Sequence, residues 1–179
     1  MRNRLLWVVA VTVVAAQLLP HPPNVTPVRA AALFGGAVFA SRWQAFAVPL
    51  GSFLLGSIAV GAFTGNWSYG FHALAPVVYA SFALSACLGL ALRRRRRLAP
   101  IAAATLAGSL LFFLVTNLAV WWFLGGFPHT AQGLAACYTA GLPYLASGSL
   151  GDIGYAALLF GGLALVERAR ASASAGSAA

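Results

Sequence analysis

The chain has 179 residues, of which 61% are hydrophobic and only 7% are charged. A soluble domain carries about 25% charged residues, so this composition excludes an ordinary soluble domain and predicts an all-α integral membrane protein in the lipid bilayer. The formal net charge of +9 comes from 11 arginines against two acidic residues, with no lysine. Because the arginines lie at the ends of apolar runs, they are typical of topology determinants, and we expect no nucleic-acid partner.

Three apolar segments occupy the first third of the chain. The first, Leu5–Leu19, resembles a signal peptide but lacks a small-residue cleavage site before Pro20, so we expect it to remain as the first membrane span. Thr26 is typical of a helix N-cap, and a second span follows from Pro27 to Ala40. This span is about 21 Å long, which is short for a hydrocarbon core of about 30 Å. The third predicted span is Gln44–Ala62.

Five consecutive arginines, Arg93–Arg97, separate the fourth and fifth predicted spans, Phe71–Leu92 and Ala99–Phe123. Such a run cannot enter hydrocarbon, and short arginine-rich loops stay on the cytoplasmic side of a membrane. With six spans, this rule places both termini and every arginine except Arg29 on the cytoplasmic side. The richness in alanine and arginine is typical of a bacterial gene, so we expect a multi-pass protein of the bacterial cytoplasmic (inner) membrane.

The region before the last span differs from the others. Ala131–Leu142 is only mildly apolar and is followed by Pro143, so we interpret it as a short outer interfacial helix and not as a crossing. The sixth span then begins near Ser149, which fits a capping box with Asp152, and it ends near Val166. The predicted fold is thus a bundle of six transmembrane helices with one short helix on its outer side.

In this arrangement a single transmembrane domain covers residues 1–168, and residues 169–179 form a flexible cytoplasmic tail. The inner loops hold little besides arginine, whereas hydrogen-bonding side chains, including all three histidines, gather on the outer side. This segregation indicates an outward-facing binding site, although outer loops also need polar residues simply to meet water. The candidate substrate-binding residues are His21, Asn24, Thr26, Arg29, Tyr69, His72, Asn117, His129, Tyr138 and Asp152.

Some of these residues have a second interpretation. A carboxylate at a helix N-terminus is stabilised there without any ligand, and Asp152 is also a candidate to pair with Arg29, the one outer arginine. No two histidines have the i, i+4 spacing of a preformed metal site, so we predict no metal site, with His21, His72 and Cys137 as the alternative ligands. Phosphate-loop, zinc-protease and serine-hydrolase motifs are absent, and we predict neither catalytic residues nor an intrinsic cofactor.

Several segments of the chain have a familiar pattern, namely residues 20–28, 32–37, 111–117 with Trp121, 128–130, 133–138, and Gly151-Asp152 with Tyr155 and Phe160. Together they resemble the family DUF6580, a group of bacterial membrane proteins regarded as transport proteins of unknown function. Within that family the chain is similar to the BtuM-type proteins, which resemble solitary substrate-binding (S) components of energy-coupling-factor (ECF) vitamin transporters with cobalamin as substrate.

This resemblance implies a six-helix S-component-like bundle with an outward pocket beneath the first, third and fifth loops. His21, His72 and the outer helix around Tyr138 would form its wall. BtuM-type proteins use a cysteine as cobalt ligand near the outer end of the fourth helix, and this chain has none there. The resemblance would give that role to His72, with His21 and Cys137 as the other candidates. The expected function is uptake of a small substrate such as a vitamin, with cobalamin as one candidate, alone or with a shared ECF energising module.

Two other functions are compatible with the same residues. The outer histidines also fit a transition-metal-binding or metal-transporting membrane protein. The third interpretation is a non-transporting membrane scaffold, whose outer polarity serves only solvation.

Overall fold

The computed structural model describes residues 2–94 and 96–176, and in this part of the chain all regular structure is helical. Four helices are long and apolar enough to cross a membrane, namely α3, α4 with the short helix that follows it, α5 and α6. The prediction of an all-α membrane bundle is confirmed. The elements are α1 (Arg2–Leu18), α2 (Val28–Val38), α3 (Arg42–Thr64), η1 (Trp67–Tyr69), α4 (Ala75–Ala91), η2 (Leu92–Arg94), α5 (Leu98–Phe123) and α6 (Ala131–Gly176).

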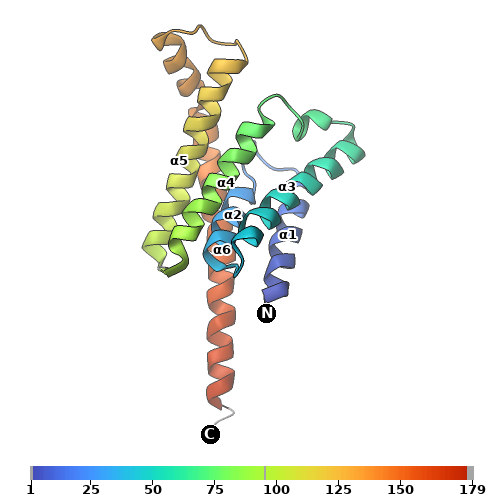
Figure 1. Ribbon diagram of the computed structural model, residues 1–179, viewed down its shortest axis with the longest axis vertical. Helices are drawn as coiled ribbons and strands as arrows, with labels where there is room; N and C mark the ends of the chain where they lie inside the picture. Colours follow the sequence, from blue (N-terminus) through green and yellow to red (C-terminus); the bar gives the residue numbers. More distant parts are fainter. Residues whose placement is uncertain (1, 95, 177–179) are drawn as a thin grey trace.

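The short helix α2 forms the centre of the bundle. Its 11 residues span about 16 Å, so the helix alone is too short to span a hydrocarbon core of about 30 Å. Every side chain from Val28 to Ala37 is buried, and α2 packs against α3, α4 and α6. Figure 1 shows α2 enclosed by these longer helices. Apart from Arg29, α2 is apolar on every side, and helices of this kind are found buried inside a protein or a membrane.

Glycines allow α2 and α4 to approach each other closely. A Cβ atom at Gly36 would collide with the main-chain oxygen of Ala86, and one at Gly89 would collide with the main-chain oxygen of Leu33. The two backbones are therefore in direct contact, which is how small residues stabilise helix pairs in membranes where water exclusion does not help.

Arg93 fixes the carboxyl end of α2. Its Nε donates to the Gly36 carbonyl and its Nη2 donates to the Phe39 carbonyl, each at 2.9 Å. These carbonyls have no partner within α2, because the last turn of a helix leaves its oxygens unpaired. The first arginine of the five-arginine run is thus a helix cap, in addition to any role in membrane topology.

The prediction of a separate outer helix was wrong, because α6 runs without interruption from Ala131 to Gly176. Pro143 lies inside it and removes only the hydrogen bond to the Thr139 carbonyl, a loss that membrane helices tolerate. Ser149 and Asp152 lie inside this helix, so the predicted capping box is also wrong. The helix is about 69 Å long and includes residues 169–176 of the predicted tail.

Two smaller boundary predictions were also wrong. Pro27, not Thr26, is the N-cap of α2, and no side chain caps that helix. Helix α4 begins at Ala75, four residues later than Phe71, because the chain makes a turn in which the Ala75 amide donates to the His72 carbonyl. These shifts leave His72 in a loop at the start of α4.

The two ends of the bundle differ in charge. In Figure 1 the N-terminus, the α2–α3 link, the α4–α5 turn and the C-terminus all point to one end, here called the arginine end, and the other links lie at the opposite end. Arg4, Arg42, Arg94 and Arg168 belong to the arginine end, whereas Arg29 is buried inside the bundle. The separation of arginines inferred from the sequence is therefore present in the fold.

Candidate functional site

A cavity of about 460 Å³ lies at the end of the bundle opposite the arginine end. It is bounded by the α1–α2 loop, the start of α4, the second half of α5 and the first half of α6. This volume falls within the range of about 300–1,000 Å³ that holds small ligands. The polar groups of its wall belong to Asn24, His72, Thr116, Asn117, Cys137 and Tyr144. Most of the remaining wall is apolar, with Leu74, Val78, Phe112, Val120 and Phe127.

Close packing of α5 on α6 places Asn117 in the cavity wall. The Cys137 thiol donates to the Asn117 carbonyl at 3.4 Å, and the Tyr138 hydroxyl donates to the Leu114 carbonyl at 2.8 Å. At Gly141 a Cβ atom would collide with the side-chain amide of Asn117, so only glycine leaves room for that amide. Asn117 Nδ2 in turn donates to the Phe113 carbonyl at 2.8 Å.

The α1–α2 loop brings Asn24 to the rim of the cavity. Asn24 has a φ of 63°, in the left-handed region that asparagine enters more readily than most residues. Three hydrogen bonds hold the loop: the Val25 amide to the Pro22 carbonyl at 3.1 Å, the Ser147 hydroxyl to the Pro23 carbonyl at 3.0 Å, and Arg29 Nη2 to the Asn24 carbonyl at 3.2 Å. The loop is thereby tied to both α2 and α6.

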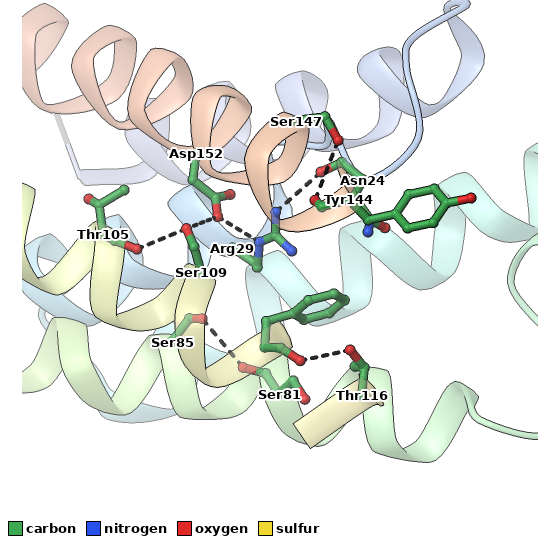
Figure 2. A network of polar contacts seen from close by, with 11 residues as sticks. Asn24, Arg29, Ser81, Ser85, Thr105, Ser109, Thr116, Tyr144, Ser147 and Asp152 are labelled. Carbon is green, nitrogen blue, oxygen red and sulfur yellow. Dashed lines mark hydrogen bonds and ion pairs between the residues drawn. The ribbon is translucent and has the colours of Figure 1, made fainter. Parts of the chain in front are cut away.

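A buried ion pair joins α2 to α6 beneath this loop. Arg29 Nε lies 2.7 Å from Asp152 Oδ2, and the two side chains are only 6% and 2% exposed. The Ser109 hydroxyl of α5 donates to the same carboxylate oxygen at 2.7 Å, and the guanidinium lies 4.4 Å from the centre of the Phe112 ring. Figure 2 shows the chain of contacts from Thr105 through Ser109 and Asp152 to Arg29 and Asn24.

The ion pair confirms one of the two sequence interpretations of Asp152. The predicted location at a helix N-terminus was wrong, since Asp152 lies in the bundle interior, within α6 and opposite the middle of α5. Its Oδ1 oxygen is buried and, among the described residues, receives no hydrogen bond. The two opposite charges of the pair cancel, and Asp152 Oδ1 is left as a buried acceptor that no described donor uses.

The cavity continues toward the ion pair through a narrow space of about 20 Å³. This space is lined by Arg29 and Ser109 together with five residues of the cavity wall, which are Asn24, Phe112, Thr116, Asn117 and Tyr144. Phe112 lines the main cavity and also contacts the Arg29 guanidinium, so a ligand in that cavity would lie close to the ion pair. The site is an apolar chamber with amide, hydroxyl and imidazole groups on its wall and a charged pair below.

The structure brings together part of the predicted set of site residues. Asn24, His72 and Asn117 line the cavity, as does Cys137, one of the alternative metal ligands. Arg29 and Asp152 lie below it.

The other predicted site residues lie outside the cavity wall. His21 is half-buried in the first loop, with its Nδ1 3.0 Å from the Pro22 carbonyl oxygen, and Thr26 follows in the same loop. Tyr69 lies in η1, and burial raises the pKa of its hydroxyl. His129 stacks on Trp122 in the α5–α6 link, where its Nε2 is 3.0 Å from the Trp121 carbonyl oxygen.

Two helical stripes line the site, and of their residues sequence reasoning found only Cys137 and Asp152. On α5 the stripe is Thr105, Ser109, Phe112 and Thr116, and on α6 it is Cys137, Gly141, Tyr144, Gly148 and Asp152. Spacings of three and four residues put each set on one face of its helix. Small or polar residues recurring at that spacing in apolar helices are a sign of an internal face, and this signal was available in the sequence.

Metal ligation receives no support from the arrangement of side chains. Within residues 2–94 and 96–176, no three histidine, cysteine, aspartate or glutamate side chains gather as a metal site requires. His72 and Cys137 both line the cavity, whereas His21 does not.

Comparison with known proteins gives one match. A family model, described as a family of unknown function (DUF6580), matches residues 1–174 and so covers nearly the whole chain, which confirms the family resemblance inferred from the sequence. Neither a curated protein nor a solved structure matches.

Proposed function

We propose that this chain, which belongs to the family DUF6580, binds a small cofactor-type molecule such as a vitamin in its cavity and mediates uptake of that molecule across the membrane. The observation that carries the proposal is the cavity of about 460 Å³ between the first loop, α4, α5 and α6. Its walls are mainly apolar, with a few convergent polar groups, which is the usual composition of a small-molecule site.

The direction of opening follows from charge. Short arginine-rich loops remain in the cytoplasm, so the arginine end faces the cytoplasm and the cavity opens to the outside. In a bacterial inner membrane this orientation places both termini inside and presents the cavity to the periplasm. A site that is open to the outside and closed toward the inside by the Arg29–Asp152 pair is suited to collecting a substrate for import.

The polar groups of the wall indicate how a ligand would be held. Aromatic and aliphatic side chains, among them Phe112 and Tyr144, would cover its flat or apolar surface. Asn117, Thr116 and Asn24 would fix its polar edge by hydrogen bonds. Cobalamin remains one candidate within this class, and His72 or Cys137 would then be the residue that approaches cobalt. An ECF energising module remains a candidate partner protein.

Ligand binding to the purified protein tests the proposal. The absorption spectrum of the detergent-purified protein reports any corrinoid that co-purifies, and melting temperatures measured with a panel of vitamins and their precursors identify other ligands. We expect one compound to raise the melting temperature, and the Asn117→Leu and His72→Ala substitutions to reduce that shift. Asn66→Ala, in an exposed loop away from the cavity, is the matched control.

Uptake by whole cells tests the transport step. Cells that express the chain should accumulate the ligand faster than cells that express Asn117→Leu, at equal protein levels. Repeating the measurement in cells without an ECF energising module separates solitary transport from assisted transport. A chain that binds no compound of the panel and changes no uptake rate would instead support the membrane scaffold.

A further inference from the structure

A second cleft, of about 540 Å³, lies at the arginine end between the start of α5 and the second half of α6. Its walls are apolar, formed by Leu98 and Ile101 of α5 and by Phe160 and Leu163 of α6. The cleft does not share a residue with the cavity described above. It is therefore a separate feature, and the proposed function makes no use of it.

Charged side chains stand at the edge of this cleft. Arg96, just before α5, and Arg168, on α6, contribute two positive charges, and Glu167 contributes one negative charge. All three side chains are exposed. The net charge at the edge of the cleft is therefore positive. The neighbouring Arg94 and Arg97 extend the positive potential along the α4–α5 turn.

The amino terminus of α5 adds to the attraction for an anion. The helix begins at Leu98, its N-cap Arg97 forms no side-chain cap, and its first turn contains no acidic residue. The first main-chain amides of a helix lack partners within the helix and carry a partial positive charge, which favours phosphate groups. In α5 these amides belong to Leu98 and Ala99, because Pro100 has no N–H and the Ile101 amide donates to the Arg97 carbonyl. Leu98 lines the cleft, so this helix end lies at its edge.

We propose that the cleft binds one anionic phospholipid, such as phosphatidylglycerol. The lipid phosphate lies between Arg96, Arg168 and the start of α5, and an acyl chain covers the apolar wall formed with Phe160 and Leu163. The apolar wall excludes a free phosphate as the natural occupant, because such an ion would leave it bare. The two arginines favour an anionic lipid over a zwitterionic one, in agreement with the behaviour of basic pockets between membrane helices.

The bound lipid has a structural consequence. Beyond the α4–α5 turn, α6 continues alone in Figure 1, and the side chains of Leu165 and Val166 are exposed. A lipid between the start of α5 and this part of α6 would cover apolar surface of both helices. It would thus hold the second half of α6 against the bundle at the membrane surface.

Lipid binding to the full-length protein is measured by native mass spectrometry, and affinities are obtained by titration. The probes are phosphatidylglycerol, phosphatidylcholine and glycerophosphoglycerol, the last being the same headgroup without acyl chains. We expect one phosphatidylglycerol per chain to bind more tightly than phosphatidylcholine, and glycerophosphoglycerol not to bind. The joint substitution of Arg96→Gln and Arg168→Gln should weaken phosphatidylglycerol binding about 30-fold, and Glu167→Gln should strengthen it about fivefold.

Two pairs of variants test whether the lipid binds in the cleft itself or is attracted only by the positive charge of the surface around it. A Cβ at Gly161, inside the cleft, or at Gly154, outside it, meets no atom within 4 Å, so a side chain can start from either position without a clash. Gly161→Leu should abolish the bound lipid, whereas Gly154→Leu should leave it. Arg42→Gln, which removes a positive charge outside the cleft, should also leave it.

Three results would overturn the proposal. The first is equal binding of phosphatidylglycerol and phosphatidylcholine, which would mean that the cleft recognises acyl chains and not the charge of the headgroup. The second is equal loss of binding in Arg42→Gln and in the Arg96/Arg168 variant, which would reduce the effect to diffuse charge. The third is retention of the lipid in Gly161→Leu.

Discussion

Breaking the buried ion pair should destabilise the bundle severely, and removing both charges together should not. Arg29→Met leaves the Asp152 carboxylate buried at 2% exposure with only the Ser109 hydroxyl as donor. Asp152→Leu leaves the guanidinium buried with only the Asn24 carbonyl as a hydrogen-bond acceptor. In both variants one uncompensated charge remains in the interior of the bundle, and that charge is the source of the cost.

The magnitude follows from the geometry. Two unit charges about 4 Å apart attract each other by about 4 kcal/mol at an effective dielectric constant of about 20. Removing one partner of a buried pair costs about 3–5 kcal/mol in proteins, whereas replacing both by apolar groups is often close to neutral. We therefore expect each single variant to lose about 3–5 kcal/mol of unfolding free energy, and the double variant Arg29→Met/Asp152→Leu to lose much less than their sum.

The assay is denaturant unfolding of the four proteins in one mixed-micelle condition, followed by helix content. The double-mutant cycle should give a coupling free energy of about 3 kcal/mol or more. Ser109→Ala provides an internal comparison, because it removes one hydrogen bond to a charged group and should cost about 1.5–3 kcal/mol. Additive effects of the two single substitutions would refute the reasoning, since they would mean that the two charges do not interact in the folded state.

Three further predictions concern the elements around the site. Arg93→Ala should lower the unfolding free energy by about 2–3 kcal/mol, because two charge-assisted hydrogen bonds to α2 are lost, whereas Arg94→Ala should change it by less than about 0.5 kcal/mol in the same assay. Gly36→Ala should cost about 2 kcal/mol or more by forcing α2 away from α4, and alanine at the unobstructed Gly154 should be neutral or stabilising. Asn24→Gly should keep the native melting temperature, whereas Asn24→Val should lower it, because a β-branched residue is strained at a φ of 63°.

The helical bundle was predictable because hydrophobic length alone identifies membrane helices. The spans around the arginine run matched α4 and α5 to within a few residues, and the shortness of the second span was also correct. Pro143 was misread, because a proline that would end a helix in water is tolerated inside a membrane helix when neighbouring groups compensate. That single error produced both the separate outer helix and the misplaced capping box.

The site was predictable only in part, for a physical reason. Assigning loops to one side of the membrane groups Asn24, His72 and Asn117, but it does not say which way each side chain points. His129 lies outside the cavity wall because its ring stacks on Trp122, and Tyr138 lies outside it because its hydroxyl donates to the Leu114 carbonyl. Such contacts depend on how α5 packs against α6, and a single sequence does not contain that information directly.

The remaining polar residues illustrate a second limit. Thr105 and Ser109 look like incidental hydroxyls in an apolar helix, and the Thr105 hydroxyl does donate to a carbonyl of its own helix. Ser109 Oγ lies 3.1 Å from the Thr105 carbonyl oxygen, but its one proton is donated to Asp152 at the shorter distance of 2.7 Å, which makes Ser109 part of the ion-pair network. The helical spacing of these hydroxyls marks a buried face, but the charged partner from α6 became apparent only in the fold.

One measurement tests the central claim that the cavity is the ligand site. A ligand identified by thermal shift is titrated into the wild-type chain, into Ala140→Trp, which fills the cavity from its α6 wall, and into Ala146→Trp, which adds the same bulk to an exposed α6 position outside it. We predict that Ala140→Trp abolishes binding and that Ala146→Trp binds with wild-type affinity. Unchanged binding by Ala140→Trp, in a protein that melts like the wild type, would contradict the account.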